Sequence, residues 1–354
     1  GGAGMGTMKH LHGQRLEQVA RHLRAVGASP RSGPAAGEDH EGDPGPVLSA
    51  EEHAFWEREG YVKVPGAVPK AMLERVKAEL FDSIGAREDE PESWYAAFER
   101  GAKPALFSSP AEWAVRSHPK VHRIFSELWG TERLWVSFDN VGIRLPDREG
   151  YDGGDGFVHW DLTEAQLRGG PSAAMRVQGV LMLEDTPADG GTFQCVPGFH
   201  QIVEEWARGL GSDELCAGGT RPVPPDLTHP SLRGRRHDGG DFELVQVGGK
   251  AGDLIVWNSY LPHGNSRNSS DRPRLAQFLT MYPETSDSTF NSNNARYNNG
   301  EAPRRDDTSL AWDHEEERRR RVTIFKLGLH VGSFDRGWSP DRPFQMKERG
   351  GGDR

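Results

Sequence analysis

The feature that most limits the fold of this chain is a succession of short β-type runs separated by turns rich in Gly, Pro and Asp. Six runs stand out: Leu134–Leu145, Arg176–Leu183, Thr192–Val196, Phe242–Val247, Asp253–Trp257 and Arg274–Tyr282. Many short strands with regular turn signals are typical of β-sandwiches and jelly rolls. The 44 Gly and 24 Pro among 354 residues agree with many turns and disfavour a long helical bundle.

Helical signals come before these runs. Ser49 and Glu52 form a capping box and Gly60 is a typical stop, which predicts a helix over 50–59. A short alternating strand follows at 61–64, and apolar residues spaced by four predict a helix over 69–84. Further helical signals continue to residue 129. We therefore predict a mainly β fold, a jelly roll behind a helical front.

The predicted domain organisation has two parts. Residues 1–46 form an N-terminal extension, with a tag-like start at 1–8, a helical pattern at 9–26 and a linker rich in Ser, Pro, Gly and acid. Residues 47–354 form a single domain. It comprises the helical front (47–130), the core (131–283) with a polar insertion at 203–241, and a polar loop with a charged C-terminal helix (284–354). Long polar segments of this kind are usually functional or disordered.

Composition excludes several classes of partner. With 43 Lys and Arg against 53 Asp and Glu, the net charge is −10, so no general positive field attracts nucleic acid. No apolar run approaches the ~20 residues of a membrane span. Two cysteines exclude a disulfide framework, and Cys195 fits a small buried apolar position. We expect a cytoplasmic protein without nucleic-acid or membrane partners, and the oligomeric state is unknown.

Three residues form a candidate metal site. His159 and Asp161 are two apart in FVHWDL, and residues i and i+2 of a strand project from the same face. His263 follows a later β run, where a folded sheet can bring it to the same point. Two His and one carboxylate with open positions are the ligands of non-heme Fe(II) oxygenases, and the open positions can bind a keto acid and O2. A structural role is the usual explanation for a single His.

A buried cation is predicted near this site. Arg274 opens the β run that follows His263, and a planar guanidinium suits a carboxylate in a partly buried pocket. Arg272 is the alternative, but it precedes Pro273 and belongs to the turn. On the strand before the metal site, Arg144 is more simply a charge at a strand end than a cavity residue.

These motifs, taken in order, resemble those of a known enzyme family. The segments LSAEEHAFWEREGYVKVPGAV, FVHWD, DTPADGGTFQCVPGFH and AGDLIVWNSYLPHGNSRNSSDRPRLAQF resemble the markers of the phytanoyl-CoA dioxygenase family of Fe(II)/2-oxoglutarate oxygenases. The resemblance covers about residues 47–283. It implies a cupin-like double-stranded β-helix, with Fe(II), the co-substrate 2-oxoglutarate and O2.

The resemblance also implies roles for single residues. His159, Asp161 and His263 would hold the metal, and Arg274 would bind the distal carboxylate of 2-oxoglutarate. Many members have Trp where this chain has Gln178, so the remaining co-substrate contacts are open; Gln178, Asn265 and Ser266 are candidates. The related halogenases lack the metal-binding carboxylate, so the presence of Asp161 favours hydroxylation, although desaturation, cyclisation and epimerisation begin with the same hydrogen abstraction.

The sequence leaves the substrate and two alternatives open. We expect a small-molecule substrate, either polar or a natural-product intermediate, and the polar loops only hint at polarity. The first alternative is a non-catalytic jelly-roll module that binds a sugar or a protein. The second, an oxygenase acting on nucleic acid, is disfavoured by the acidic composition.

Other candidate residues have simpler explanations. His118 and His122 have a zinc-like spacing, but Pro119 stands where a metalloprotease needs Glu, so a surface helix is the better interpretation. His200 fits a structural role. Trp160, between the two ligand positions, should project to the opposite face and pack there.

Overall fold

The computed structural model describes residues 45–99, 109–132, 134–136, 139–169, 177–219, 221–283 and 329–331. Four predictions lie outside these residues: the helix at 9–26, most of the linker, the polar loop after residue 283 and the charged C-terminal helix. Within the described part of the chain, no helix is long and apolar enough to cross a membrane.

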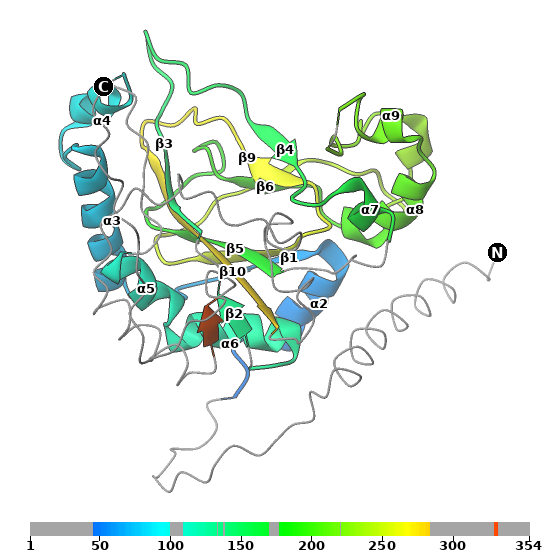
Figure 1. Ribbon diagram of the computed structural model, residues 1–354, viewed down its shortest axis with the longest axis horizontal. Helices are drawn as coiled ribbons and strands as arrows, with labels where there is room; N and C mark the ends of the chain where they lie inside the picture. The colour runs from blue at the N-terminus through cyan, green and yellow to red at the C-terminus, as the bar shows by residue number, and fades with distance from the viewer. Residues whose placement is uncertain are drawn as a thin grey trace, which may run out of the picture.

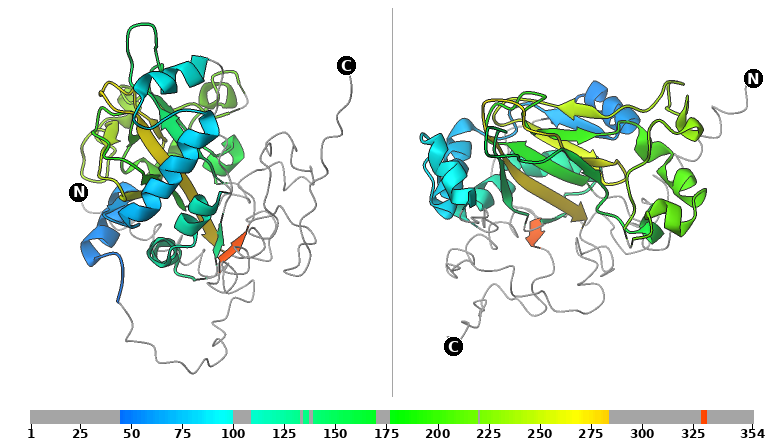
Figure 2. Two further views of the ribbon diagram at one scale, coloured as in Figure 1. Left: turned by 90° about the vertical axis from the view of Figure 1, so that its left-hand side faces the viewer. Right: turned by 90° about the horizontal axis from the view of Figure 1, so that it is seen from above.

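Two sheets form the centre of the molecule (Figures 1 and 2). The larger has the order β1-β8-β5-β10-β2-β11, and β3 also pairs with β10; the smaller has the order β4-β9-β6-β7. Every pair is antiparallel except β2 with β11. The strands are β1 (Tyr61–Val64), β2 (Leu134–Val136), β3 (Val141–Arg144), β4 (Phe157–His159), β5 (Val177–Met182), β6 (Phe193–Cys195), β7 (Val245–Val247), β8 (Leu254–Asn258), β9 (His263–Asn265), β10 (Arg274–Pro283) and β11 (Leu329–Val331). The predicted jelly-roll core with flanking helices is confirmed.

Helices flank the sheets at both ends. In Figure 1, α3, α4 and α5 stand at one end and α7, α8 and α9 at the other, and Figure 2 agrees. Their bounds are α2 (Ala50–Glu59), α3 (Lys70–Ile84), α4 (Pro91–Glu99), α5 (Pro110–Arg116), α6 (Pro119–Trp129), α7 (Glu164–Leu167), α8 (Val203–Arg208) and α9 (Ser212–Leu215), with 3-10 turns at Phe199–Gln201 and Pro230–Leu232. The capping box of Ser49 and Glu52 is formed, and Gly60 ends α2 with a left-handed φ of 79°.

The central strands bury both faces because successive side chains point to opposite sides. On β5, Val177 and Leu181 pack in one apolar cluster with the helices of the front, while Val180 and Met182 pack in a second cluster. β8 divides in the same way. This alternation sends the even-numbered residues of β5 and β10 toward the smaller sheet, and that inner side carries the candidate site.

The insertion at 203–241 is more ordered than its polar sequence suggested. It contains α8, α9 and a 3-10 turn. A buried carboxylate anchors its end: Glu59, at the end of α2, accepts hydrogen bonds from Arg236 at 3.0 and 3.1 Å, and its Oε1 lies 3.3 Å from His237 Nε2. Because Glu59 lies two residues before β1, this contact ties the insertion to the larger sheet.

Candidate active site

A single strand pair brings the two candidate His ligands together. β4 and β9 run antiparallel with His159 directly opposite His263, and their ring centroids lie 4.7 Å apart. The pairing is very close at Gly264, where a Cβ would lie 1.8 Å from the carbonyl oxygen of Phe157. Only glycine tolerates this approach of two backbones, so Gly264 sets the register that places the imidazoles side by side.

Asp161 completes the group just beyond the end of β4. Its carboxylate lies 3.4 Å from Nε2 of His159 and 3.6 Å from Nε2 of His263. The candidate ligand atoms of all three residues lie within 4.8 Å of one another. The strand ends at His159, so Asp161 follows it in a bend and not in the strand that the sequence predicted; its carboxylate nevertheless reaches the same side.

Neighbouring groups fix the protonation and orientation of these ligands. Partial burial would raise the pKa of Asp161, but hydrogen bonds with His159, His263 and Gln178 outweigh it and hold that pKa well below its usual value. Nδ1 of His263 lies 2.9 Å from the carbonyl oxygen of Leu261; because that oxygen can only accept, Nδ1 donates to it, and this contact turns Nε2 toward Asp161. The group thus presents one anionic oxygen and imidazole nitrogens together.

The group lines a cavity of about 300 Å³ between the sheets. Aromatic side chains form much of its wall, and polar ones are spread among them. The full lining is Asp139, Asn140, Phe157, His159, Asp161, Gln178, Gly179, Val180, Phe193, Trp257, His263, Gly264, Asn265, Arg274, Phe278 and Thr280.

Arg274 is a buried cation in this cavity. It opens β10 and is 6% exposed, and its guanidinium lies 5.3 Å from the centroid of the Phe278 ring. Among the described residues it forms no ion pair. Burial, and secondarily the charge of Arg144 opposite it on β3, lower the pKa of Arg274 to about 10, so it remains charged at neutral pH. Arg272 is exposed in the preceding turn and is not part of the lining.

The other sequence candidates divide into two groups. Gln178 and Asn265 line the cavity, and Gln178 Nε2 donates to Asp161 Oδ2 at 2.8 Å. Ser266 lies outside the lining, where its buried hydroxyl donates to the carbonyl of Arg267. Arg144 also lies outside it and donates to the carbonyls of Gly154 and Asp155.

Three structural interpretations agree with the fold. Trp160 is buried on the face opposite the ligands, and its Nε1 donates to the carbonyl of Tyr260 at 3.0 Å. His200 is buried, with Nε2 3.3 Å from the carbonyl oxygen of Glu57. Cys195 is fully buried, and burial raises the pKa of its thiol well above the usual value.

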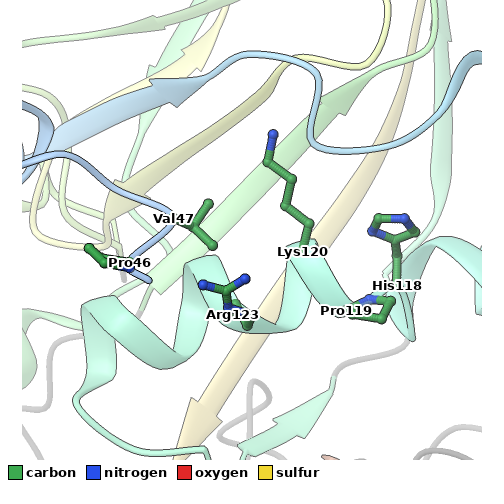
Figure 3. Close-up of a pocket in the computed structure, with 6 residues that line it drawn as sticks. All are labelled: Pro46, Val47, His118, Pro119, Lys120 and Arg123. Atoms are coloured by element: carbon green, nitrogen blue, oxygen red, sulfur yellow. The ribbon is translucent and has the colours of Figure 1, made fainter. Parts of the chain in front are cut away.

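The zinc-like pair of His residues does not form a metal site. His118 caps the start of α6 while His122 lies inside that helix, with Nε2 2.9 Å from the carbonyl oxygen of Glu132. His118 borders a separate surface hollow of about 430 Å³ together with Pro46, Val47, Pro119, Lys120 and Arg123 (Figure 3). The ammonium of Lys120 already donates to the carbonyls of Pro65 and Gly66, and no carboxylate borders the hollow.

Several cavity residues had no assignment from sequence. Phe157 stands two positions before His159, so strand alternation was a usable signal for it. Asp139 and Asn140 lie between strands and carry no such signal. Thr280 and Phe278 share the inner face of β10 with Arg274, and the same alternation could have found them.

Comparison with known proteins gives a family match and distant relatives. The family model for phytanoyl-CoA dioxygenase (PhyH) matches residues 56–276. A Dictyostelium discoideum protein that carries the name of a phytanoyl-CoA dioxygenase is 24% identical over 282 residues, which are 68% of this chain and 76% of that protein. The Ava biosynthesis cluster protein O of Aspergillus versicolor is 25% identical over 176 residues, which are 49% of this chain and 54% of that protein.

Solved structures with a similar chain path include two enzymes. The epimerase SnoN, crystallised with Fe3+, alpha ketoglutarate and nogalamycin RO, has a TM-score of 0.45 and 20% identity, covering 68% of this chain and 88% of its own. EctD from S. alaskensis, crystallised with 2-oxoglutarate and 5-hydroxyectoine, has a TM-score of 0.46 and 18% identity. The match covers 69% of this chain and 79% of EctD. At these TM-scores the likeness adds nothing to what the family match shows.

Proposed function

Because this chain belongs to the phytanoyl-CoA dioxygenase family, we propose that the cavity between its sheets is the active site of an Fe(II)- and 2-oxoglutarate-dependent oxygenase. The protein is thus an oxidoreductase of the non-heme iron class. The expected products are succinate and CO2 from 2-oxoglutarate and an oxidised, most simply hydroxylated, small-molecule substrate.

The observation that carries the proposal is the close group of His159, Asp161 and His263. Two imidazole side chains and one carboxylate, with their ligand atoms within 4.8 Å of one another, fit the donor set of a non-heme Fe(II) centre with open positions. The low pKa of Asp161 keeps its carboxylate anionic, which suits a dication. These three residues would hold the iron.

Arg274 fits the second requirement, an anion beside the metal. A buried guanidinium without a protein counter-ion is unfavourable unless an anionic ligand pairs with it. A dicarboxylate that reaches from the iron to Arg274 supplies that partner through a charge-assisted, bidentate contact. We therefore assign the distal carboxylate of 2-oxoglutarate to Arg274.

When bound, iron and the keto acid supply the oxidation: O2 is consumed, 2-oxoglutarate becomes succinate and CO2, and the substrate is oxidised. The side chains of the protein position these groups. The Leu261 carbonyl orients His263, and Gln178 orients Asp161. Phe193 and Trp257 line the cavity and pack against His263, with ring centroids 6.4 and 5.0 Å from it, so they hold the imidazole in an apolar surrounding.

The test uses the purified chain under nitrogen. Addition of Fe(II) and then 2-oxoglutarate should give a metal-to-keto-acid absorption band, and admission of air should release succinate. His263→Ala and Asp161→Ala should abolish the band and succinate release together, whereas His122→Ala, a matched change outside the cavity, should retain both. Equal succinate yield in the Asp161→Ala variant would refute the ligand assignment.

Other parts of the prediction stay proposals. We retain a single domain from residue 47 onward, a cytoplasmic location, hydroxylation over other oxidations, and a substrate that is polar or a natural-product intermediate. SnoN was crystallised with nogalamycin RO and EctD with 5-hydroxyectoine, and small molecules are the class of substrate we propose. No observation favours the non-catalytic binding module, since a binder needs no such ligand set.

A further inference from the structure

Two residues that are cross-strand neighbours in the proposed active site each carry a polar atom without a partner among the described residues. Nε1 of Trp257 and Oε1 of Gln178 are buried, and neither has a hydrogen-bond partner among the described residues. Gln178 on β5 lies directly opposite Trp257 on β8, so both side chains leave the sheet on the same face. Both residues line the cavity. Buried polar atoms in native proteins are rarely left unpaired, so this adjacent pair indicates a missing partner.

The orientation of the Gln178 amide follows from its neighbour. Gln178 Nε2 donates to Asp161 Oδ2 at 2.8 Å, and the oxygens of a carboxylate are acceptors. The amide nitrogen therefore faces Asp161. The amide oxygen can only accept a hydrogen bond. None of the described residues donates one to it, so it is available to a ligand in the cavity.

Trp257 provides the complementary half. The indole nitrogen is a donor only, and Trp257 is 4% exposed, so water at the surface does not satisfy it. Its ring is held by Phe193, at 4.7 Å between centroids, and by His263 at 5.0 Å. The strand register thus places a residue with a free donor directly opposite a residue with a free acceptor, and His263 packs against the first of them.

We propose that Trp257 and Gln178 recognise a hydroxyl group of the substrate, which accepts from the indole N–H and donates to the amide oxygen. This inference rests on the proposed function of the cavity. A hydroxyl is the simplest group that offers a donor and an acceptor on one atom. An ether oxygen offers only the acceptor, and it would leave Gln178 Oε1 unpaired.

The walls of the cavity define the rest of the substrate. Phe278 lies on the inner face of β10, and Phe157 is 46% exposed on β4, with its ring 5.3 Å from the His159 ring. An aromatic side chain left exposed at a cavity is suited to contact the carbon skeleton of a ligand. About 300 Å³ is at the small end for a ligand pocket and must also hold 2-oxoglutarate. The part of the substrate that enters the cavity is therefore small, and the aromatic walls favour an apolar carbon skeleton around the recognised hydroxyl.

The experiment measures binding without turnover. The protein is loaded with Zn(II), which does not support the oxidation, and with 2-oxoglutarate. Saturation-transfer NMR then compares cyclohexanol with its methyl ether, and a methyl hexopyranoside with its fully O-methylated form. At least one alcohol should bind more tightly than its ether by roughly tenfold, the effect of one neutral hydrogen bond.

Variants assign the preference to the two residues. Trp257→Phe keeps the ring and removes the donor, so the preference for alcohol over ether should fall about tenfold. Trp206→Phe, the same change on α8 outside the cavity lining, should keep the wild-type preference. Gln178→Met should lose the preference and also weaken metal binding, because it removes the hydrogen bond to Asp161.

Two results would overturn the inference. One is equal binding of every alcohol and its ether by the wild-type protein, which would mean that the two atoms are satisfied within the protein. The other is an unchanged preference in Trp257→Phe. Failure of the proposed function gives a different result. In that case 2-oxoglutarate itself would show no metal-dependent binding signal, independently of how the alcohols and ethers bind. If Trp257→Phe does not fold, the wild-type comparison still decides.

Discussion

Replacement of Arg274 by Met should change stability and co-substrate binding in opposite directions. Arg274 is 6% exposed, has no counter-ion among the described residues and faces the charge of Arg144 across β3 and β10. Met has a flexible, unbranched side chain of similar reach, so it removes the charge with little loss of packing. The variant therefore isolates the effect of the guanidinium.

The magnitudes follow from the burial. An unpaired buried charge destabilises a protein by several kcal/mol, and water in the cavity reduces this cost. The free energy of unfolding of ligand-free Arg274→Met should therefore exceed that of the wild type by about 1–3 kcal/mol. The melting temperature should rise by a few degrees. Loss of one partner of a buried charge pair weakens binding by about 2–5 kcal/mol, so the Kd for 2-oxoglutarate should rise roughly 30-fold to several-thousand-fold.

Calorimetry measures both quantities on the same protein, by thermal unfolding without ligand and by titration of 2-oxoglutarate in the presence of Zn(II). Arg272→Met, an exposed neighbour in the turn, is the matched control and should change neither value appreciably. Arg274→Lys keeps the charge but loses the planar fork, so it should retain only part of the affinity. A less stable ligand-free Arg274→Met protein with unchanged 2-oxoglutarate affinity would refute the reasoning.

Three further predictions concern the surrounding structure. Gly264→Ala places a Cβ 1.8 Å from the Phe157 carbonyl oxygen, so it should separate β4 from β9. A metal titration should then show greatly weakened binding of Zn(II) or Fe(II). Gly211→Ala, with no atom near its Cβ position, is the control and should bind metal normally. Cys195 should not react with a thiol reagent until the protein unfolds, because burial suppresses its thiolate; rapid modification of the native protein would contradict this. Burial, with Cys195 and Glu59 nearby, raises the pKa of Tyr61 to about 12, so its stabilising contribution is complete below pH ~10 and is lost as the pH rises toward 12. The ultraviolet titration of wild type minus that of Tyr61→Phe should show a phenol that ionises late, and a difference centred near pH 10 would exclude the shift.

The sequence alone determined the elements and the metal-site candidates. Local signals suffice for a capping box, for a helix with apolar residues every fourth position and for short β runs between Gly and Pro turns. These predictions succeeded for α2, α3 and most strands of the two sheets because they depend on neighbours along the chain, whereas β11 lies in a segment predicted to be loop and helix. The spacing of His159 and Asp161, and the β context of His263, likewise lie within short segments.

The tertiary structure alone decided which residues meet. The β4–β9 register, made possible by Gly264, sets His159 opposite His263 across 104 positions of sequence. Ser266 directly follows β9 and was a candidate contact for 2-oxoglutarate. Its hydroxyl instead donates to the carbonyl of Arg267, and the residue lies outside the cavity lining. One-residue differences of this kind depend on where a strand begins or ends, which the local pattern does not specify.

The pairing of Gln178 with Trp257 makes the same distinction for recognition. Each residue is visible in the sequence, but their adjacency arises from the antiparallel register of β5 and β8. That neither atom has a partner within the described part of the chain is a property of the packed cavity. Sequence thus determined which chemical groups are available, and the fold decided which are paired and which are left for a ligand, because pairing depends on distances between strands that are remote along the chain.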